Sequence, residues 1–211
     1  MPTSKPSKSR GRPVARVGDS ELVGKRRAQI VKVATQLIAR DGFAKTVVRD
    51  IAKEADISVG LVYEYVRTKE DILFLIFDYW ANIYESTITE IAATGKPPLE
   101  RFSSIVDWLV KEAHENYEMT LLFYREVGNL TSDGRKIWVA QEKRYVKRII
   151  EVLEEGKTDG SVAKDVDCEL AATNCLFLAS GWALKRHILQ HSRTWEEYAA
   201  WIVTCVLCAG T

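Results

Sequence analysis

Residues 46–71, TVVRDIAKEADISVGLVYEYVRTKED, predict two short helices, a tight turn between them and the start of a third helix. The first helix should present one apolar stripe, made by four residues at helical spacing: Val48, Ile51, Ala52 and Ala55. We expect Thr46 to cap this helix, because a threonine hydroxyl satisfies a free N–H group of a first turn. Asp56 falls at the turn, where a residue that tolerates left-handed dihedrals is needed.

Capping residues also mark the two helices that follow. Ser58 is placed to cap the second helix, which Val62 and Val66 should anchor to the interior. Thr68 is placed to cap the third helix, with Asp71 as the other member of a capping box. A helix, a tight turn and a helix form the arrangement that lays its second helix in the major groove of DNA. The stretch therefore predicts a DNA-binding module.

This stretch resembles the N-terminal module of the TetR family of transcriptional regulators, and the resemblance extends back to Arg26. It is carried by Thr46, Ile51, Ala52, Ala55, Ile57, Ser58, Gly60, Tyr63, Tyr65, Lys69 and the apolar run from Ile72. Two positions differ from the family pattern, since Asp56 stands where Gly is usual and Val66 where Phe is usual. The resemblance implies an all-α protein: a three-helix, helix-turn-helix DNA-binding module followed by a C-terminal helical bundle for ligand binding and dimerisation.

The resemblance also implies which residues meet DNA. Five match positions that reach base edges, namely Val48, Arg49, Val59, Gly60 and Leu61. Tyr63 and Lys69 match phosphate contacts, and the helix-start residues Thr46 and Ser58 complete the candidate set.

The chemistry of these residues agrees with such a role. Residues 58–65 contain no Arg, Lys, Asn or Gln, so the second helix has few ways to read bases by bidentate hydrogen bonds. Val59 and Leu61 suit thymine methyl groups, and Gly60 removes a side chain where backbone must approach DNA closely. Arg49 is the long donor able to bind guanine O6 and N7, although a surface ion pair is the alternative.

The charge of the chain is distributed unevenly along its 211 residues. Residues 1–20 carry five basic groups against one acidic group, residues 21–71 ten against eight, and residues 72–211 fifteen against twenty. A basic front and an acidic rear suit a protein whose N-terminal end faces phosphates. We divide the chain into a flexible basic arm (1–20), a helix-turn-helix DNA-binding domain (21–71) and a ligand-binding and dimerisation domain (72–211).

The N-terminal arm contains Arg10-Gly11-Arg12-Pro13, which resembles the core of an AT-hook. Arg10 and Arg12 suit a narrow minor groove, where the negative potential is deepest. The alternative is a solvated tail that binds any polyanion weakly.

Apolar periodicity predicts helices outside the quoted stretch at 25–41, 72–93, around 102–113, 120–130, 133–155, 167–190 and 194–209. The resemblance implies that the last two long helices form a four-helix bundle with a second copy. A two-fold homodimer would place two reading helices about 34–36 Å apart on DNA, so we expect a palindromic operator.

The resemblance also implies a small-molecule effector that releases the protein from DNA. Candidate pocket residues are the aromatic and polar side chains Trp108, Phe123, Tyr124, Arg125, Asn129, Tyr145, Phe177 and Trp182. Residues 121–130, LLFYREVGNL, resemble TetR members that sense acyl-CoA thioesters, whereas a flat aromatic ligand fits the composition equally well. Aromatic residues at helical spacing are also often plain core.

Other classes of function are disfavoured. No Walker loop, HExxH, GxSxG or dinucleotide fingerprint occurs, so we expect neither an enzyme nor a cofactor. We interpret the cysteines Cys168, Cys175, Cys205 and Cys208 as core thiols and expect no metal site; a metal or redox pair is the alternative for Cys205 and Cys208, which form a CxxC motif. No secretory signal or apolar span of about 18 residues is evident, which favours a cytoplasmic protein. The main rival is an effector-independent, architectural DNA-binding protein.

Overall fold

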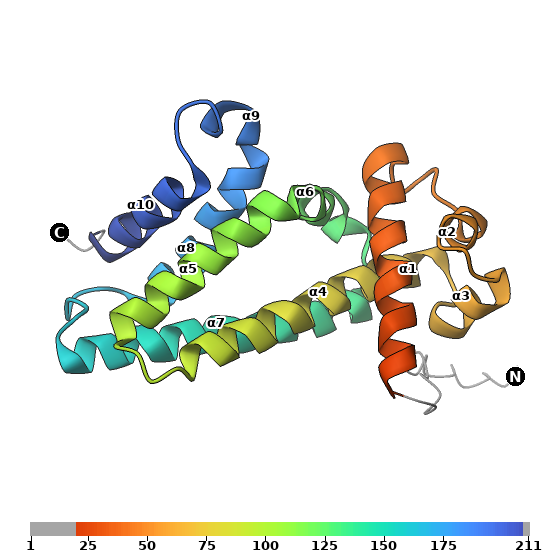
Figure 1. The fold of residues 1–211 in the computed structure, drawn as a ribbon. Coiled ribbons are helices and arrows are strands. Elements are labelled where there is room, and N and C mark those ends of the chain that lie inside the picture. Colours follow the sequence, from red (N-terminus) through yellow and green to blue (C-terminus); the bar gives the residue numbers. More distant parts are fainter. Residues whose placement is uncertain (1–19, 209–211) are drawn as a thin grey trace, which may run out of the picture.

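Ten α-helices and one short 3-10 helix form all the regular structure of residues 20–208, the part of the chain that this computed structural model describes. Side chains are described from Leu22 to Leu207. Three helices lie together at one end of the molecule: α1 (Ser20–Asp41), α2 (Val48–Glu54) and α3 (Val59–Tyr65) (Figure 1). Among the described residues there is no strand, so the all-α prediction is confirmed.

The remaining helices form a bundle that extends away from this end (Figure 1). The long helices α4 (Lys69–Ala92) and α7 (Ser132–Asp159) run side by side along it. The others are α5 (Pro98–Glu115), α6 (Tyr117–Glu126) with the 3-10 helix η1 (Val127–Asn129), α8 (Cys168–Leu184), α9 (Arg186–Leu189) and α10 (Trp195–Cys208). In the part of the chain with described coordinates, no helix is both long and apolar enough to cross a bilayer.

The turn chemistry of the N-terminal module follows the sequence closely. Asp56 adopts φ 50°, the left-handed conformation expected at the turn between α2 and α3. The Ser58 hydroxyl accepts a hydrogen bond from the Leu61 N–H at 3.1 Å, which caps α3. Thr68 and Asp71 form the complete capping box at the start of α4.

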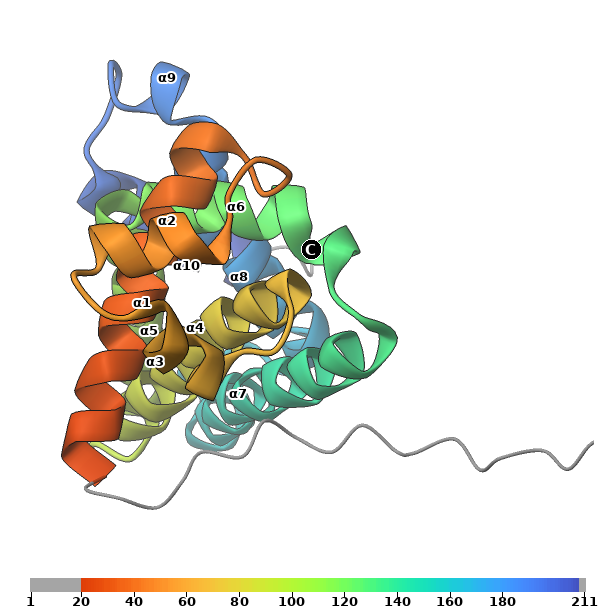
Figure 2. The ribbon, with the colours of Figure 1, turned by 90° about the vertical axis from the view of Figure 1, so that its right-hand side faces the viewer.

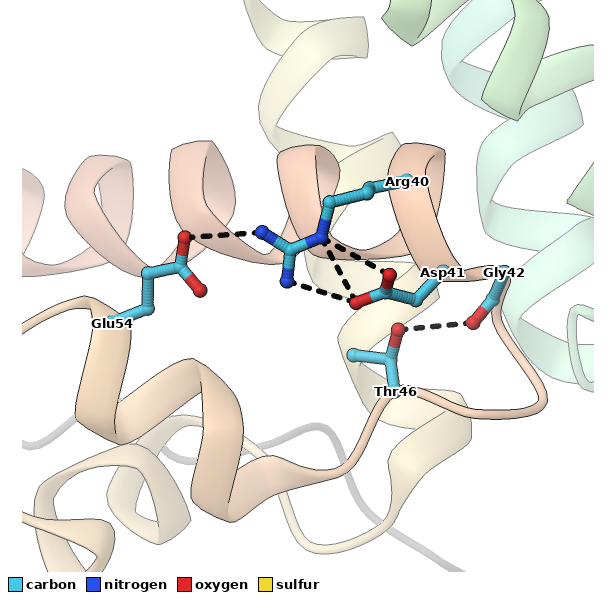
Figure 3. Close-up of polar contacts among 5 residues, drawn as sticks. All are labelled: Arg40, Asp41, Gly42, Thr46 and Glu54. Atoms are coloured by element: carbon cyan, nitrogen blue, oxygen red, sulfur yellow. Dashed lines mark hydrogen bonds and ion pairs between the residues drawn. The ribbon is translucent and has the colours of Figure 1, made fainter.

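Thr46 is an exception, because it does not cap α2. The N-cap residue is Val47, which offers no side-chain hydrogen bond. The Thr46 hydroxyl instead donates to the Gly42 carbonyl at 3.0 Å and so ties the loop back to the end of α1 (Figure 3). A threonine hydroxyl can reach the backbone carbonyl four residues before it, and this competing hydrogen bond forms here in place of the cap.

Helix boundaries in the C-terminal part differ from the predictions in two places. The helix expected over 133–155, with Gly156 and Gly160 closing it, continues to Asp159, and Gly160 alone ends it, with φ 83°. Gly156 lies within α7, where a β-carbon would stand 2.6 Å from Val162. The single helix expected over 167–190 is two helices, α8 and α9, which meet at Lys185.

The two hydrophobic cores of the molecule share α4. Its first half, including Ile72, Leu73 and Ile76, packs with α1, α2 and α3. Its second half, including Ile88, packs with α5, α7, α8 and α10. The view in Figure 2, down the axis from the N-terminal module, shows α4 passing from this module into the bundle. The predicted boundary at residue 71 therefore falls within the first turn of a helix that belongs to both parts.

The helix-ending role of Gly42 is testable, because it adopts φ 85° and a β-carbon there would meet nothing within 4 Å. Gly42→Ala should lower the free energy of unfolding by about 1 kcal/mol through backbone strain alone. Gly24→Ala is the matched control, since Gly24 lies inside α1 in equally open space, and it should raise the same quantity by about 0.5–1 kcal/mol. Urea unfolding followed by circular dichroism measures both, and equal effects of the two substitutions would contradict this account.

Candidate functional site

The exposed face of α3 carries apolar and aromatic side chains that do not pack in the core. Val59 is 38% exposed and Tyr63 is 52% exposed, and Gly60 lies between them. Leu61 is half-buried, while Arg49 on α2 is exposed. The structure thus brings these five candidate DNA contacts to the surface of the helix-turn-helix module.

Two candidate DNA contacts lie in the interior instead. Thr46 is only 4% exposed and Val48 only 9%, and Val48 packs in the core of the module. The prediction that these two side chains contact DNA is therefore wrong for this conformation. The helical period explains the error, because Val48 begins the same stripe as Ile51 and that stripe faces inward. The neighbouring Val47, the N-cap residue of α2, is 48% exposed, although it was not among the predicted DNA contacts.

Lys69, predicted to contact phosphate, binds residues of the loop between α1 and α2. Its ammonium donates to the Ala44 carbonyl at 2.7 Å and lies 4.6 Å from the centre of the Phe43 ring. Both contacts hold the positive charge at the first residue of α4, where free backbone N–H groups also favour an anion. Arg10 and Arg12 of the N-terminal arm lie outside the described residues.

A charge cluster holds α2 against the end of α1. Arg40 donates to both carboxylate oxygens of Asp41 and lies 3.7 Å from Glu54 at the end of α2 (Figure 3). The hydrogen bond from Arg40 lowers the pKa of the Asp41 carboxyl. All three groups are exposed to solvent, so dissolved salt screens their attraction. The cluster therefore contributes more to the orientation of α2 than to the stability of the fold.

A cavity of about 460 Å³ lies among five helices, α4, α5, α6, α7 and α8. Four of the predicted pocket residues line it, namely Phe123, Tyr124, Tyr145 and Phe177. Further aromatic residues of its wall were not singled out from the sequence: Phe77, Trp80, Tyr84 and Trp138. Phe77, Trp80 and Tyr84 lie on α4 at helical spacing, so the sequence pattern alone could have placed them on one face.

The other predicted pocket residues serve the core and the junction between the two parts. Trp108 packs edge-on against Tyr84, with ring centres 4.9 Å apart. Trp182 is 1% exposed and donates from its indole N–H to His114 Nδ1 at 3.0 Å. Neither lines the cavity, because a large aromatic side chain on a helix packed from several sides fills core space first.

Arg125 and Asn129 were also predicted to face the ligand, but both bind the buried carboxylate of Glu126. Arg125 Nε and Asn129 Nδ2 each donate to it at 2.8 Å. Arg125 Nη2 donates in addition to the Ile38 carbonyl near the end of α1 at 2.9 Å. These contacts correct the prediction, because they compensate a buried charge and fasten α6 to the DNA-binding module.

Three charged residues join the aromatic wall of the cavity: Glu142 and Lys143 on α7 and Glu169 on α8. Burial raises the pKa of the Glu142 carboxyl above its usual range. Burial, and then the negative charge of Glu142, raise the pKa of the nearby Tyr145 phenol. Burial likewise raises the pKa of Tyr84. The cavity is therefore apolar with a few polar groups, which is the usual makeup of a small-molecule site.

A polar chain connects the DNA-binding module to the helices that line the cavity. Arg27 of α1 forms an ion pair with Asp78 of α4. The second oxygen of Asp78 accepts a hydrogen bond from Gln141 Nε2 of α7 at 2.6 Å. Since Gln141 precedes Glu142, this chain joins α1 to the helix that forms one cavity wall.

This fold and these surfaces define a helix-turn-helix transcription regulator with an internal cavity. Comparison with known sequences agrees: the family described as "Bacterial regulatory proteins, tetR family" matches residues 30–76, and "Tetracyclin repressor-like, C-terminal domain" matches residues 95–183. The HTH-type transcriptional regulator HbdR of Aromatoleum sp. (strain CIB) is 32% identical over 182 residues, which cover 86% of this chain and 79% of HbdR. The chain belongs to the TetR family, and it is a transcriptional regulator, not an enzyme.

Solved structures share the fold over most of their length. AibR in complex with isovaleryl coenzyme A and operator DNA is 21% identical, with a TM-score of 0.71 over 86% of this chain and 98% of AibR. FadR from Bacillus subtilis in complex with stearoyl-CoA is 18% identical, with a TM-score of 0.71 over 85% of this chain and 97% of FadR. At these identities the likeness concerns the fold.

Proposed function

We propose that this chain is a repressor that binds a palindromic operator as a homodimer in the cytoplasm and leaves it when a CoA thioester fills the cavity. One observation carries the proposal: a single helix, α4, belongs to the core of the helix-turn-helix module and also lines the cavity. Leu73 and Ile76 pack under the module, whereas Trp80 and Tyr84 line the cavity a few turns later. A ligand that moves α4 therefore moves the reading helix.

For DNA, the proposal assigns α3 to the major groove and Arg49 to a base edge. Within 4 Å, a β-carbon added at Gly60 would meet only the Ser58 hydroxyl, at 3.9 Å, so the exposed backbone of Gly60 has room for close approach. Val59 provides an apolar contact suited to thymine methyl groups. The structure gives Arg49 no ion pair with any described residue, which supports base contact over the alternative of a surface pair.

Arg49→Ala should weaken binding to the cognate operator by about 1–3 kcal/mol and weaken binding to random DNA much less, because a bidentate contact with guanine is specific to one base. Fluorescence anisotropy with both duplexes at fixed salt measures the difference. Lys111→Ala, which removes the same charge on α5 far from the module, is the control. Equal losses on both duplexes would show that Arg49 contacts phosphate only.

Dimerisation is proposed through α8 and α10. Apolar residues occupy all sides of α8, although a helix at the surface of a monomer normally keeps a polar face. Phe177 is 61% exposed on α8 and Trp201 is 43% exposed on α10, and the two helices pack against each other. Exposed aromatic residues on adjoining helices are typical of a homodimer interface.

Trp201→Glu should raise the dimer dissociation constant roughly thirtyfold or more, since it would bury a charge within the proposed apolar interface. Analytical ultracentrifugation over a concentration series measures this constant. Leu121→Glu is the control, because Leu121 is similarly exposed but lies on α6, outside the proposed interface. A wild-type chain that sediments as a monomer at all concentrations would overturn the homodimer.

The CoA thioester class is supported by the position of charge around the cavity. Lys143 lines the cavity and also a shallow surface groove that includes Arg135 and Lys136. An apolar acyl group inside and phosphates outside would match this arrangement, because ammonium and guanidinium groups bind phosphate. Two structural neighbours were solved with CoA thioesters, isovaleryl coenzyme A and stearoyl-CoA.

The thioester proposal predicts loss of operator binding. Among isovaleryl-CoA, octanoyl-CoA and benzoyl-CoA at saturating concentration, at least one should lower operator affinity tenfold or more, which corresponds to about 1.4 kcal/mol of coupling. Free CoA is the control, because it carries the phosphates without an acyl group. Gel-shift titration measures the effect. Unchanged affinity with every thioester would favour the architectural, effector-independent alternative.

A further inference from the structure

The turn between α2 and α3 leaves the carbonyl of Ala55 in need of a side-chain donor. α2 ends in a Schellman motif, in which the N–H of Ile57 donates to the Ala52 carbonyl at 3.0 Å and the N–H of Asp56 to the Lys53 carbonyl at 3.2 Å. Among the described residues, no backbone N–H donates to the Ala55 carbonyl. Ala55 is buried, and a buried carbonyl without a donor is costly.

Gln29 of α1 supplies the missing donor. Its Nε2 donates to the Ala55 carbonyl at 2.6 Å. Arg26 fixes the orientation of this amide, because Arg26 Nη1 donates to Gln29 Oε1 at 2.9 Å. A guanidinium can only donate, so the amide oxygen must face Arg26 and the amide N–H₂ group must face Ala55.

This hydrogen bond acts on the peptide unit that precedes the left-handed residue of the turn. The C=O of Ala55 and the N–H of Asp56 belong to one planar peptide. Gln29 binds the oxygen of this peptide, and the Lys53 carbonyl binds its N–H. Asp56 itself has φ 50°, a conformation that is less favourable for aspartate than for glycine. The two hydrogen bonds therefore hold the turn in a conformation that its own residue disfavours.

The direction of α3 depends on this turn. α3 is a helix of seven residues that Val62 anchors in the core, and it packs chiefly against α2. Ala55 lies only three residues before Ser58, the N-cap residue of α3. A rotation of the peptide between Ala55 and Asp56 would therefore change the direction of α3.

We propose that Gln29 is a positioning residue for DNA recognition, which sets the direction of α3 and transmits the position of α1 to it. The inference rests on the proposed placement of α3 in the major groove. Arg27, next to Arg26 on α1, forms the ion pair with Asp78 of α4. α1 is thus bonded to α4 on one side and to the turn between α2 and α3 on the other. A shift of α4 would reach α3 through Gln29.

Fluorescence anisotropy with two duplexes tests this role: the duplex that the wild-type protein selects from a randomised pool, and a scrambled duplex of the same composition. Gln29→Met keeps the length of the side chain but removes the donor. It should lower the ratio of the two affinities roughly three- to tenfold, because base contacts need the correct direction of α3 and phosphate contacts need it less. Asp56→Gly should recover most of this loss when combined with Gln29→Met, since glycine adopts the left-handed conformation without strain.

Gln36→Met is the matched control, because Gln36 is an exposed glutamine of the same helix. It should leave the ratio unchanged. Urea unfolding of each variant provides the second measurement: a lower midpoint for Gln29→Met with an unchanged affinity ratio would make Gln29 a purely structural residue and overturn the proposal. A loss that Asp56→Gly does not reduce would overturn it as well. If the wild-type protein prefers no duplex over its scrambled form, the placement of α3 in the major groove fails, and this inference fails with it.

Discussion

The structure depends on one constraint: α4 is a single unbroken helix that is packed into two hydrophobic cores. Its first turns are held by the module of α1, α2 and α3, and its later turns by the bundle. Close-packed cores rearrange between discrete states and resist gradual deformation. Under the proposed function, a change at the cavity wall formed by Trp80 and Tyr84 would reach the DNA-binding module as a movement of the whole helix.

Polar contacts fix where the module sits on this helix. Asp78 binds Arg27 of α1 and Gln141 of α7, and Arg125 of α6 binds a carbonyl near the end of α1. Buried polar contacts of this kind add little net stability, because desolvation offsets most of the attraction. Their directional bonds do specify one arrangement of α1 against α4, α6 and α7. A ligand that rotates α7 by a small angle would strain the Gln141–Asp78 bond first.

The sequence predicted the parts of this fold that local chemistry controls. The Ser58 cap, the Thr68–Asp71 capping box and the left-handed Asp56 all depend on neighbours within four residues, and all were confirmed. Errors arose where a partner distant in sequence, or a competing one, decides the outcome. Arg125 binds a carbonyl 87 residues away and Trp182 a histidine 68 residues away, so neither position is visible to periodicity. The Thr46 hydroxyl donates to the Gly42 carbonyl and therefore does not form the cap of α2 that its position had predicted.

For the proposed repressor, the energetics of release favour a homodimer over a monomer. Moving an equilibrium from 99:1 to 1:99 requires about 5.5 kcal/mol of differential binding. A ligand present at a hundred times its dissociation constant contributes about 2.7 kcal/mol per site if it binds one state only. A single cavity would therefore leave a substantial fraction of the protein on DNA. In the proposed homodimer, two coupled cavities would together supply nearly the required difference at the same ligand concentration.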